Sequence, residues 1–212
     1  MGRTKLFTIL TVCTGNICRS PAAEILLSRA LDHSVTVTSA GTYGMPSWPV
    51  SPPMARLLAT GESDSDVAAF RSTTLTAQRI QDADLILALA GEHKRAILEL
   101  VPSALRRTFT LGEFARLAAS VPYENVAADR TDQVDGVIDR VGDGPNLTDA
   151  GRFSELVKAA NRQRSQIPHR KPGDDVIDPY GLGDQVYAQS YAQIQADIAQ
   201  ILAALSREGT AR

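Results

Sequence analysis

The feature that most limits the fold lies near the N-terminus, where a short apolar run meets a polar loop and then a helical segment. Residues 6–12 are mostly apolar or β-branched, which is typical of a buried strand. The loop at residues 13–20 reads Cys-Thr-Gly-Asn-Ile-Cys-Arg-Ser. Pro21 then begins an alanine- and leucine-rich segment that ends near Leu31, and proline is well tolerated in the first helical turn. A buried strand followed directly by a helix predicts a βαβ unit and hence a parallel sheet.

The same alternation of strand and helix patterns continues along the chain. Further strands are predicted at residues 34–39, 84–90 and 108–111, and helices at residues 54–60, 76–81, 92–100 and 112–120. Near the C-terminus, apolar residues recur every three or four positions, at Tyr187, Tyr191, Ile194, Ile198, Ile201 and Leu205. This spacing predicts one long amphipathic helix that packs on the sheet.

Residues 120–172 interrupt this rhythm and are interpreted as an insertion. Two short helical patterns lie within it, Val134, Val137, Ile138 and Val141, followed by Phe153, Leu156, Val157 and Ala160. Without the insertion the chain has the size of one ordinary domain, so residues 1–212 are predicted to form a single domain. The insertion is either a solvated excursion packed on the last helix or a surface that recognises a protein substrate or a partner subunit.

Charge and composition exclude several functions. The 22 basic and 24 acidic residues give a net charge of −2, so there is no basic excess to bind a nucleic acid. Two cysteines and three isolated histidines, His33, His93 and His169, are too few for a disulfide scaffold or a metal site. Each histidine is expected to be a surface or hydrogen-bonded structural residue. No metal or cofactor is expected.

The N-terminus does not resemble a secretory signal, because its apolar stretch is short and runs straight into the polar loop. The sequence also contains no run of about 18 apolar residues, the length needed for a membrane-spanning helix. The expectation is a soluble cytoplasmic protein without membrane association.

The loop at residues 13–20 combines the residue types that bind an oxyanion beside a nucleophile. Its place before a helix directs backbone N–H groups and the positive end of the helix dipole at one point. Gly15 and Asn16 tolerate the left-handed backbone that such a cradle requires. Arg19 can donate two hydrogen bonds to one oxyanion, and the thiol of Cys13 should ionise in this positive field. Ser20 could donate to that thiolate or cap the helix.

Residues 12–24 resemble the signature of the low-molecular-weight protein tyrosine phosphatases. The resemblance continues at Ser39-Ala40-Gly41-Thr42, at residues 82–89 and at Asp178-Pro179-Tyr180, and covers most of residues 5–119 and 173–205. It implies a doubly wound, four-stranded parallel sheet of order 2-1-3-4 with helices on both faces. It places the phosphate-binding loop after the first strand, and the insertion then precedes the loop that carries the general acid.

The same resemblance implies a role for each residue of the site. Cys13 is the nucleophile, Arg19 binds the phosphoryl oxygens, and Asp178 first protonates the leaving group and then activates water. The remaining loop residues implied to bind phosphate are Thr14, Gly15, Asn16, Ile17, Cys18 and Ser20. Ser39 is implied to brace the loop with Asn16, and Ser20 to stabilise the thiolate.

Two finer features of the site have alternatives. Tyr180 and one aromatic residue from the proline-rich loop 42–53 are implied to enclose a phenyl ring. Trp48 is the first candidate, with Tyr43 or Met45 as substitutes, although Trp48 could instead hold its own loop together. The resemblance also implies a reversible disulfide between Cys13 and Cys18, while Cys18 could simply be a small buried apolar residue.

The predicted function is hydrolysis of phosphotyrosine or aryl phosphate monoesters through a phosphocysteine. The partner is then a phosphotyrosine protein, such as a tyrosine kinase. One alternative is an arsenate reductase that uses an external thiol, since this scaffold also carries Cys-Thr-Gly-Asn followed by Cys-Arg-Ser in such enzymes. Another is a non-catalytic module that binds phosphate or phosphotyrosine. The sequence does not indicate an oligomeric state.

Overall fold

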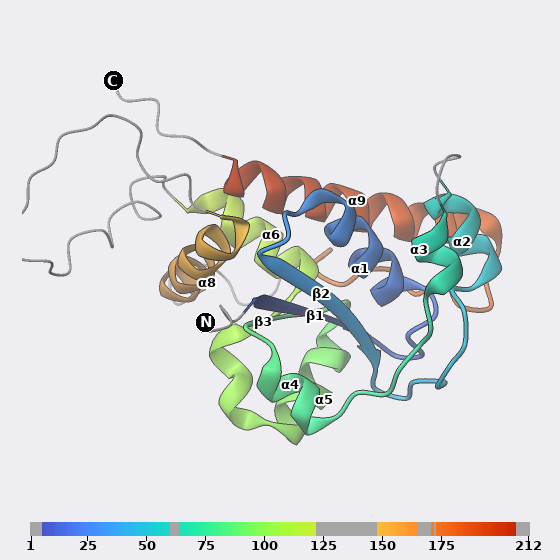
Figure 1. The fold of residues 1–212 in the computed structure, drawn as a ribbon, viewed down its shortest axis with the longest axis horizontal. Helices are drawn as coiled ribbons and strands as arrows, with labels where there is room; N and C mark the ends of the chain where they lie inside the picture. Colours follow the sequence, from blue (N-terminus) through green and yellow to red (C-terminus); the bar gives the residue numbers. More distant parts are fainter. Residues whose placement is uncertain (1–5, 60–63, 122–147, 165–170, 172, 207–212) are drawn as a thin grey trace, which may run out of the picture.

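A four-stranded parallel sheet forms the centre of the protein (Figure 1). The computed structural model describes residues 6–59, 64–121, 148–164, 171 and 173–206. The strands are β1 (Phe7–Cys13), β2 (Val35–Gly41), β3 (Leu85–Ala88) and β4 (Thr108–Thr110), in the order β2-β1-β3-β4. The doubly wound α/β fold, its parallel strands and its strand order are confirmed.

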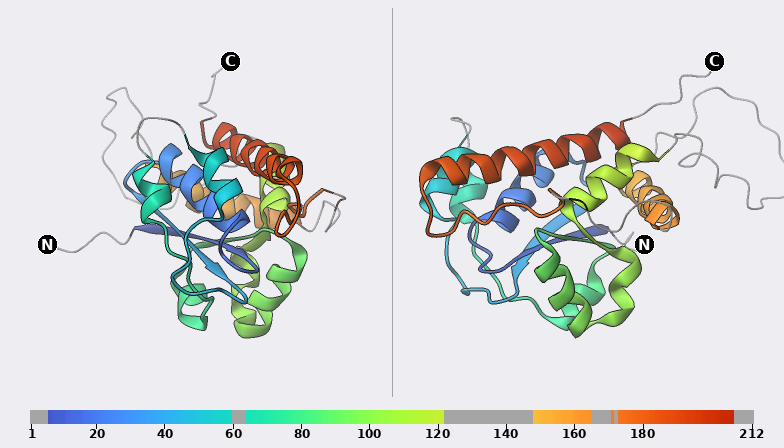
Figure 2. Two further views of the ribbon diagram at one scale, coloured as in Figure 1. Left: turned by 90° about the vertical axis from the view of Figure 1, so that its right-hand side faces the viewer. Right: turned by 180° about the vertical axis from the view of Figure 1, so that it is seen from behind.

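Alternating side chains of the central strands pack against helices on both faces of the sheet. Ile9 belongs to the larger apolar cluster and its neighbour Leu10 to the smaller one, because successive strand residues point to opposite faces. The larger cluster is covered by α1 (Arg19–Ala30), α2 (Pro52–Leu58), α6 (Leu111–Ser120) and α9 (Asp184–Leu205). The smaller is covered by α4 (Ala77–Asp82), α5 (Gly91–Leu100) and the 3₁₀ helix η1 (Pro102–Arg107). Figure 2 shows α9 running along one side of the sheet, opposite the α4 and α5 side.

Most predicted elements are confirmed, with small shifts at their ends. Pro21 lies within the first turn of α1, as its missing N–H favours. The long C-terminal helix is α9, which buries Tyr187, Ile194, Ile198 and Ile201. Two short elements were not predicted, α3 (Ser65–Ala69) and η1. The helices of the described residues include none with the length and hydropathy of a transmembrane span.

The second helix predicted in the insertion is present as α8 (Asp149–Arg164). It buries Phe153, Leu156 and Ala160 as the spacing predicts, and Phe153 stacks on Phe7 of β1 with ring centroids 5.7 Å apart. The helix therefore belongs to the main core. The first predicted helix, at Val134–Val141, lies outside the described residues.

The strand order places the phosphate loop at a crevice in the sheet. From β1 the chain crosses to β2 on one side, while β3 and β4 lie on the other side of β1. In open α/β sheets, ligands bind at the carboxyl ends of the strands where the order reverses in this way. The loop after β1 and the N-terminus of α1 lie at this point.

Candidate active site

The loop between β1 and α1 is held in shape by Asn16. This residue has a φ of 57°, in the left-handed region that asparagine tolerates better than most residues. Its side-chain amide donates to Ser20 Oγ at 2.9 Å and to Ser39 Oγ at 2.7 Å, and its carbonyl oxygen accepts from the Thr73 backbone N–H at 2.7 Å. Because Asn16, Ser20 and Ser39 are buried, Asn16 and Ser39 brace the loop from its inner side, as the resemblance implies.

Cys13 is the last residue of β1, and its sulfur faces two hydrogen-bond donors. Its Sγ lies 3.0 Å from Ser20 Oγ and 3.3 Å from the backbone nitrogen of Asn16, whose N–H points at it. The Ser20 oxygen already accepts from Asn16, which leaves the Ser20 O–H free to donate to the sulfur. Ser20 makes no capping hydrogen bond for α1, so of its two predicted roles the structure has the contact with Cys13.

Arg19 and Asp178 approach each other across the site. The Arg19 side chain is 3% exposed and its Nη2 donates to Asp178 Oδ2 at 2.7 Å. The same nitrogen lies 3.4 Å from Thr14 Oγ1, and Nη1 donates to the Val176 carbonyl at 3.3 Å. The loop that carries Asp178 is tied to the sheet by Val176, whose N–H donates to the Leu89 carbonyl at 2.8 Å. The acid predicted 159 residues away in sequence from Arg19 is thus in direct contact with it.

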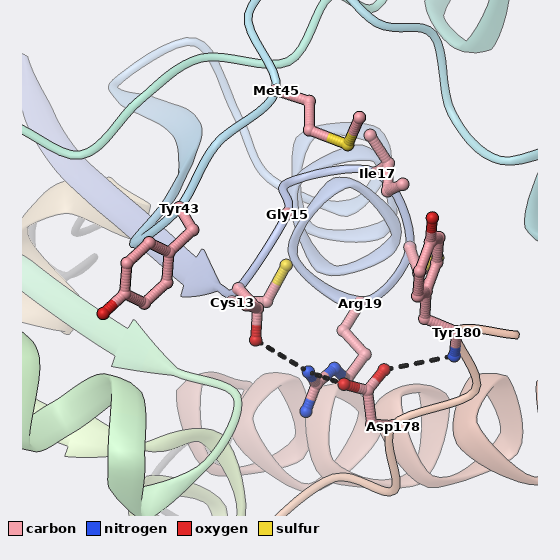
Figure 3. A pocket seen from close by; sticks show the side chains of 10 residues that line it. Cys13, Gly15, Ile17, Arg19, Tyr43, Met45, Asp178 and Tyr180 are labelled. Atoms are coloured by element: carbon pink, nitrogen blue, oxygen red, sulfur yellow. Dashed lines mark hydrogen bonds and ion pairs between the residues drawn. The ribbon is translucent and has the colours of Figure 1, made fainter.

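These groups line one pocket of about 200 Å³, shown in Figure 3. Its floor comes from the loop between β1 and α1, and its walls are largely apolar. Tyr43 and Tyr180 stand on opposite sides of it, with Ile17 and Met45 between them. The complete lining is Cys13, Thr14, Gly15, Ile17, Cys18, Arg19, Tyr43, Met45, Asp178 and Tyr180.

The prediction that Trp48 walls the pocket is wrong, and its two substitutes take the place. Backbone N–H groups of Tyr43 and Met45 donate to the carbonyls of Thr14 and Gly15, so this segment lies along the phosphate loop. The close approach needs Gly41, where a Cβ would come within 2.5 Å of the Thr14 oxygen. Trp48 instead pairs with Ser72 through backbone and hydroxyl hydrogen bonds, which turn the chain away from the pocket.

Cys18 lines the pocket, but its thiol points into a separate set of contacts. Its Sγ donates to Ser51 Oγ at 3.2 Å and lies 3.7 Å from the Tyr187 hydroxyl. Burial raises the pKa of the Cys18 thiol, which keeps it protonated. Cys13 and Cys18 are both free thiols in this structure. A reversible disulfide between them stays a prediction.

Two polar residues, one half-buried and one buried, were not predicted to lie at the site. Glu24 on α1 accepts from Ser39 Oγ, and burial raises the pKa of its carboxyl group. His93 on α5 is 1% exposed, and its Nε2 lies 2.9 Å from Thr14 Oγ1. Burial, aided by the charge of Arg19, lowers the pKa of His93 to about 4, so the ring is neutral at physiological pH. The available signals were the four-residue spacing of Ser20 and Glu24 on one helix face, and the position of His93 just after a parallel strand.

The comparisons with known proteins agree with this geometry. Residues 8–126 match the model of the low molecular weight phosphotyrosine protein phosphatase family. The chain belongs to this family. Over 116 residues it is 40% identical to a probable low molecular weight protein-tyrosine-phosphatase, EpsP, of Ralstonia solanacearum. The aligned residues make up 55% of this chain and 78% of that protein.

The relatives include two kinds of phosphatase. A protein-arginine-phosphatase of Geobacillus stearothermophilus is 38% identical over 108 residues, covering 51% of this chain and 71% of that protein. Among solved structures, the Erwinia amylovora tyrosine phosphatase AmsI superposes with a TM-score of 0.62 at 22% identity, covering 95% of each chain. At that identity the superposition supports the fold alone. The family match and the relatives identify this chain as a cysteine-dependent phosphatase of the low-molecular-weight class.

Proposed function

We propose that this phosphatase hydrolyses phosphotyrosine in proteins through a phosphocysteine intermediate. One observation carries the proposal: a thiol and a guanidinium from one loop meet a carboxylate from a distant part of the chain in one pocket with apolar walls. The chemistry requires a nucleophile, a clamp for the phosphoryl oxygens and an acid for the leaving group, and Cys13, Arg19 and Asp178 supply them.

In the first step, the Cys13 thiolate attacks phosphorus while the bond from phosphorus to the tyrosine oxygen breaks. Arg19 and the loop N–H groups bind the non-bridging oxygens, whose charge they balance. Arg19 currently donates to the Asp178 carboxylate, and phosphoryl oxygens compete for the same guanidinium. Their binding frees Asp178 from Arg19, and the carboxylate takes up a proton from water, which it donates to the phenolate oxygen as the bond to phosphorus breaks.

In the second step, water attacks the phosphorus of the phosphocysteine. Asp178, now a carboxylate, accepts a proton from that water. The bond between sulfur and phosphorus breaks, which releases inorganic phosphate and restores the Cys13 thiolate. Ser20, whose O–H is free to donate to the sulfur, stabilises the thiolate as the leaving group.

The walls of the pocket favour tyrosine over arginine as the residue that carries the phosphate. Ile17, Met45 and Tyr180 present apolar surface to a flat ring. A phosphoarginine side chain carries several N–H groups that lose water on entry, and each needs an acceptor. Asp178 is the one carboxylate among the lining residues, and its proposed role is to donate a proton to the leaving group rather than to accept from it.

A direct comparison of substrates tests the proposal. We expect kcat/KM for a phosphotyrosyl peptide to exceed that for the matched phosphoarginyl peptide by at least about tenfold. Faster hydrolysis of the phosphoarginyl peptide would make the protein an arginine phosphatase. Binding of both peptides without turnover of either would identify a non-catalytic module.

Two variants test the assigned roles. Cys13→Ser should abolish turnover of p-nitrophenyl phosphate, because a neutral serine hydroxyl is a poor nucleophile. Asp178→Ala should lower kcat by about 10²- to 10⁴-fold, the usual contribution of a general acid. An unchanged kcat in Asp178→Ala would assign the acid to another residue.

A further inference from the structure

A second groove adjoins the catalytic pocket on the side of Tyr43. It has a volume of about 340 Å³ and lies between the loop that carries Tyr43 and helix α5. Thr14 and Tyr43 line both the groove and the catalytic pocket. The two cavities therefore adjoin at Thr14 and Tyr43, and a ligand bound at Cys13 that extends past Tyr43 reaches the groove.

One face of α5 supplies the charges of the groove. Glu92, Arg95 and Glu99 are spaced three and four residues apart, so they project from the same side of the helix, and all three are exposed. Among the residues that the structure describes, neither Glu92 nor Glu99 has a lysine or arginine nitrogen within ion-pair distance. The groove thus carries two carboxylates against one guanidinium.

The floor of the groove adds no positive charge and is connected to the catalytic arginine. His93 is buried and neutral, and it contacts the same Thr14 hydroxyl that Arg19 approaches. Glu92 Oε1 lies 3.4 Å from His93 Nε2, the same nitrogen that contacts Thr14 Oγ1. The Glu92 carboxylate is therefore close to the phosphate loop. The acidic character of the groove therefore begins close to the phosphotyrosine position.

Tyr43 adds an aromatic surface at the boundary of the two cavities. It is 82% exposed, and in Figure 3 it lies across Cys13 and Arg19 from Tyr180. An exposed aromatic ring beside carboxylates favours an alkyl-ammonium or guanidinium group, through contact of the cation with the ring face.

We propose that this groove binds the peptide segment next to the phosphotyrosine and selects substrates with a lysine or arginine close to it. The inference rests on the proposed function, because it takes phosphotyrosine as the group in the catalytic pocket. Glu92 and Glu99 attract the basic side chain, Tyr43 packs against it, and acidic flanking residues are repelled.

Phosphotyrosyl peptides that differ at one flanking position provide the test. Lysine, alanine or glutamate is placed in turn at each position near the phosphotyrosine, and kcat/KM is measured at low ionic strength. At the best position we expect lysine to exceed glutamate by about tenfold, the size that attraction to and repulsion from two exposed carboxylates can produce. The ratio should shrink in about 0.5 M salt, because salt screens exposed charges.

Charge variants of α5 assign the preference to the groove. For each variant, kcat/KM for every peptide is divided by kcat/KM of the same variant for p-nitrophenyl phosphate, which corrects for any change in basal activity. The double variant Glu92→Gln, Glu99→Gln should reduce the ratio to about twofold, and Glu92→Lys, Glu99→Lys should reverse it. The control Asp82→Asn removes an exposed carboxylate from α4 and should keep the full preference.

The outcomes separate this inference from the proposed function. Efficient hydrolysis of all the peptides at similar rates, a preference for glutamate, or an unchanged ratio in the double glutamine variant would overturn the inference and leave the phosphatase assignment intact. Failure to hydrolyse any phosphotyrosyl peptide, with phosphoarginyl peptides turned over, would overturn the proposed function and this inference with it.

Discussion

Asn16 illustrates how much of the site depends on one residue. Its backbone adopts a left-handed conformation, and its side chain joins Ser20, Ser39 and the backbone of Thr73. Through Ser20 these contacts orient the hydroxyl that faces the Cys13 sulfur. The geometry of the nucleophile is therefore set by a residue that does not line the pocket.

Two substitutions separate the backbone role of Asn16 from its hydrogen bonds. Asn16→Gly and Asn16→Ala both remove three hydrogen bonds, which should lower the free energy of unfolding by about 2 kcal/mol or more. Alanine should cost about 1 kcal/mol beyond glycine, because only alanine is strained at this φ. Urea denaturation measures both values, and kcat should fall in both variants. Equal stability of the two variants would contradict a strained backbone at this position.

His93 should make the stability of the protein depend on pH. Its pKa in the folded state is about 4, below the ordinary value of 6.5, so the unfolded chain binds a proton first as the pH falls. The contribution of neutral His93 to the free energy of unfolding is therefore fully present above about pH 6.5, and it is lost as the pH falls towards about 4. Relative to His93→Gln, the wild type should lose roughly 2 to 3 kcal/mol of unfolding free energy between about pH 7.5 and about pH 4.5.

Urea denaturation of both proteins at the two pH values measures this difference. Subtracting the change in the variant from the change in the wild type cancels the contributions of titrating groups that the substitution leaves undisturbed. Parallel changes in the two proteins would show that His93 is not held neutral by burial.

At the scale of elements, helix α8 lies in the segment predicted to be an insertion, and its apolar residues are part of the core. The apolar spacing of Phe153, Leu156 and Ala160 was sufficient to predict it, because a helix buries residues that recur every three or four positions. Its stacking on β1 could not be predicted, since it depends on contact between Phe153 and Phe7, which are far apart in the sequence.

Phe153→Ala tests whether α8 is integral to the fold. The side chain is fully buried and stacks on Phe7, so its removal should lower the unfolding free energy by about 3 to 4 kcal/mol. Val157→Ala, at a half-buried position on the same helix, should cost only about 1 kcal/mol. Thermal and urea denaturation measure both. Similar small losses in the two variants would indicate that α8 is only loosely attached to the sheet.

At the scale of the whole molecule, local patterns and the family resemblance predicted different things. Hydrophobic spacing was enough for the strands, the long helix α9 and the parallel connections. The strand order and the placing of Arg19 and Asp178 in one site came from the resemblance, because nothing local in sequence joins positions so far apart. Trp48 was misplaced for the same reason: its loop is directed by hydrogen bonds to Ser72, which no local pattern reveals.

The molecule brings its reactive groups together by joining the end of β1, the N-terminus of α1 and the loop before α9 at one edge of the sheet. The predicted insertion lies between α6 and the acid loop, and its described helix α8 contacts the sheet through Phe7 rather than through the pocket.

Trapping the covalent intermediate tests the proposed chemistry most directly. Asp178→Ala is mixed with a ³²P-labelled phosphotyrosyl peptide, quenched within the first turnover, and digested for mass spectrometry. A phosphoryl group on the sulfur of Cys13, absent from the Cys13→Ser control, is the expected result. Turnover without any labelled protein, or a label on a residue other than Cys13, would contradict a phosphocysteine mechanism.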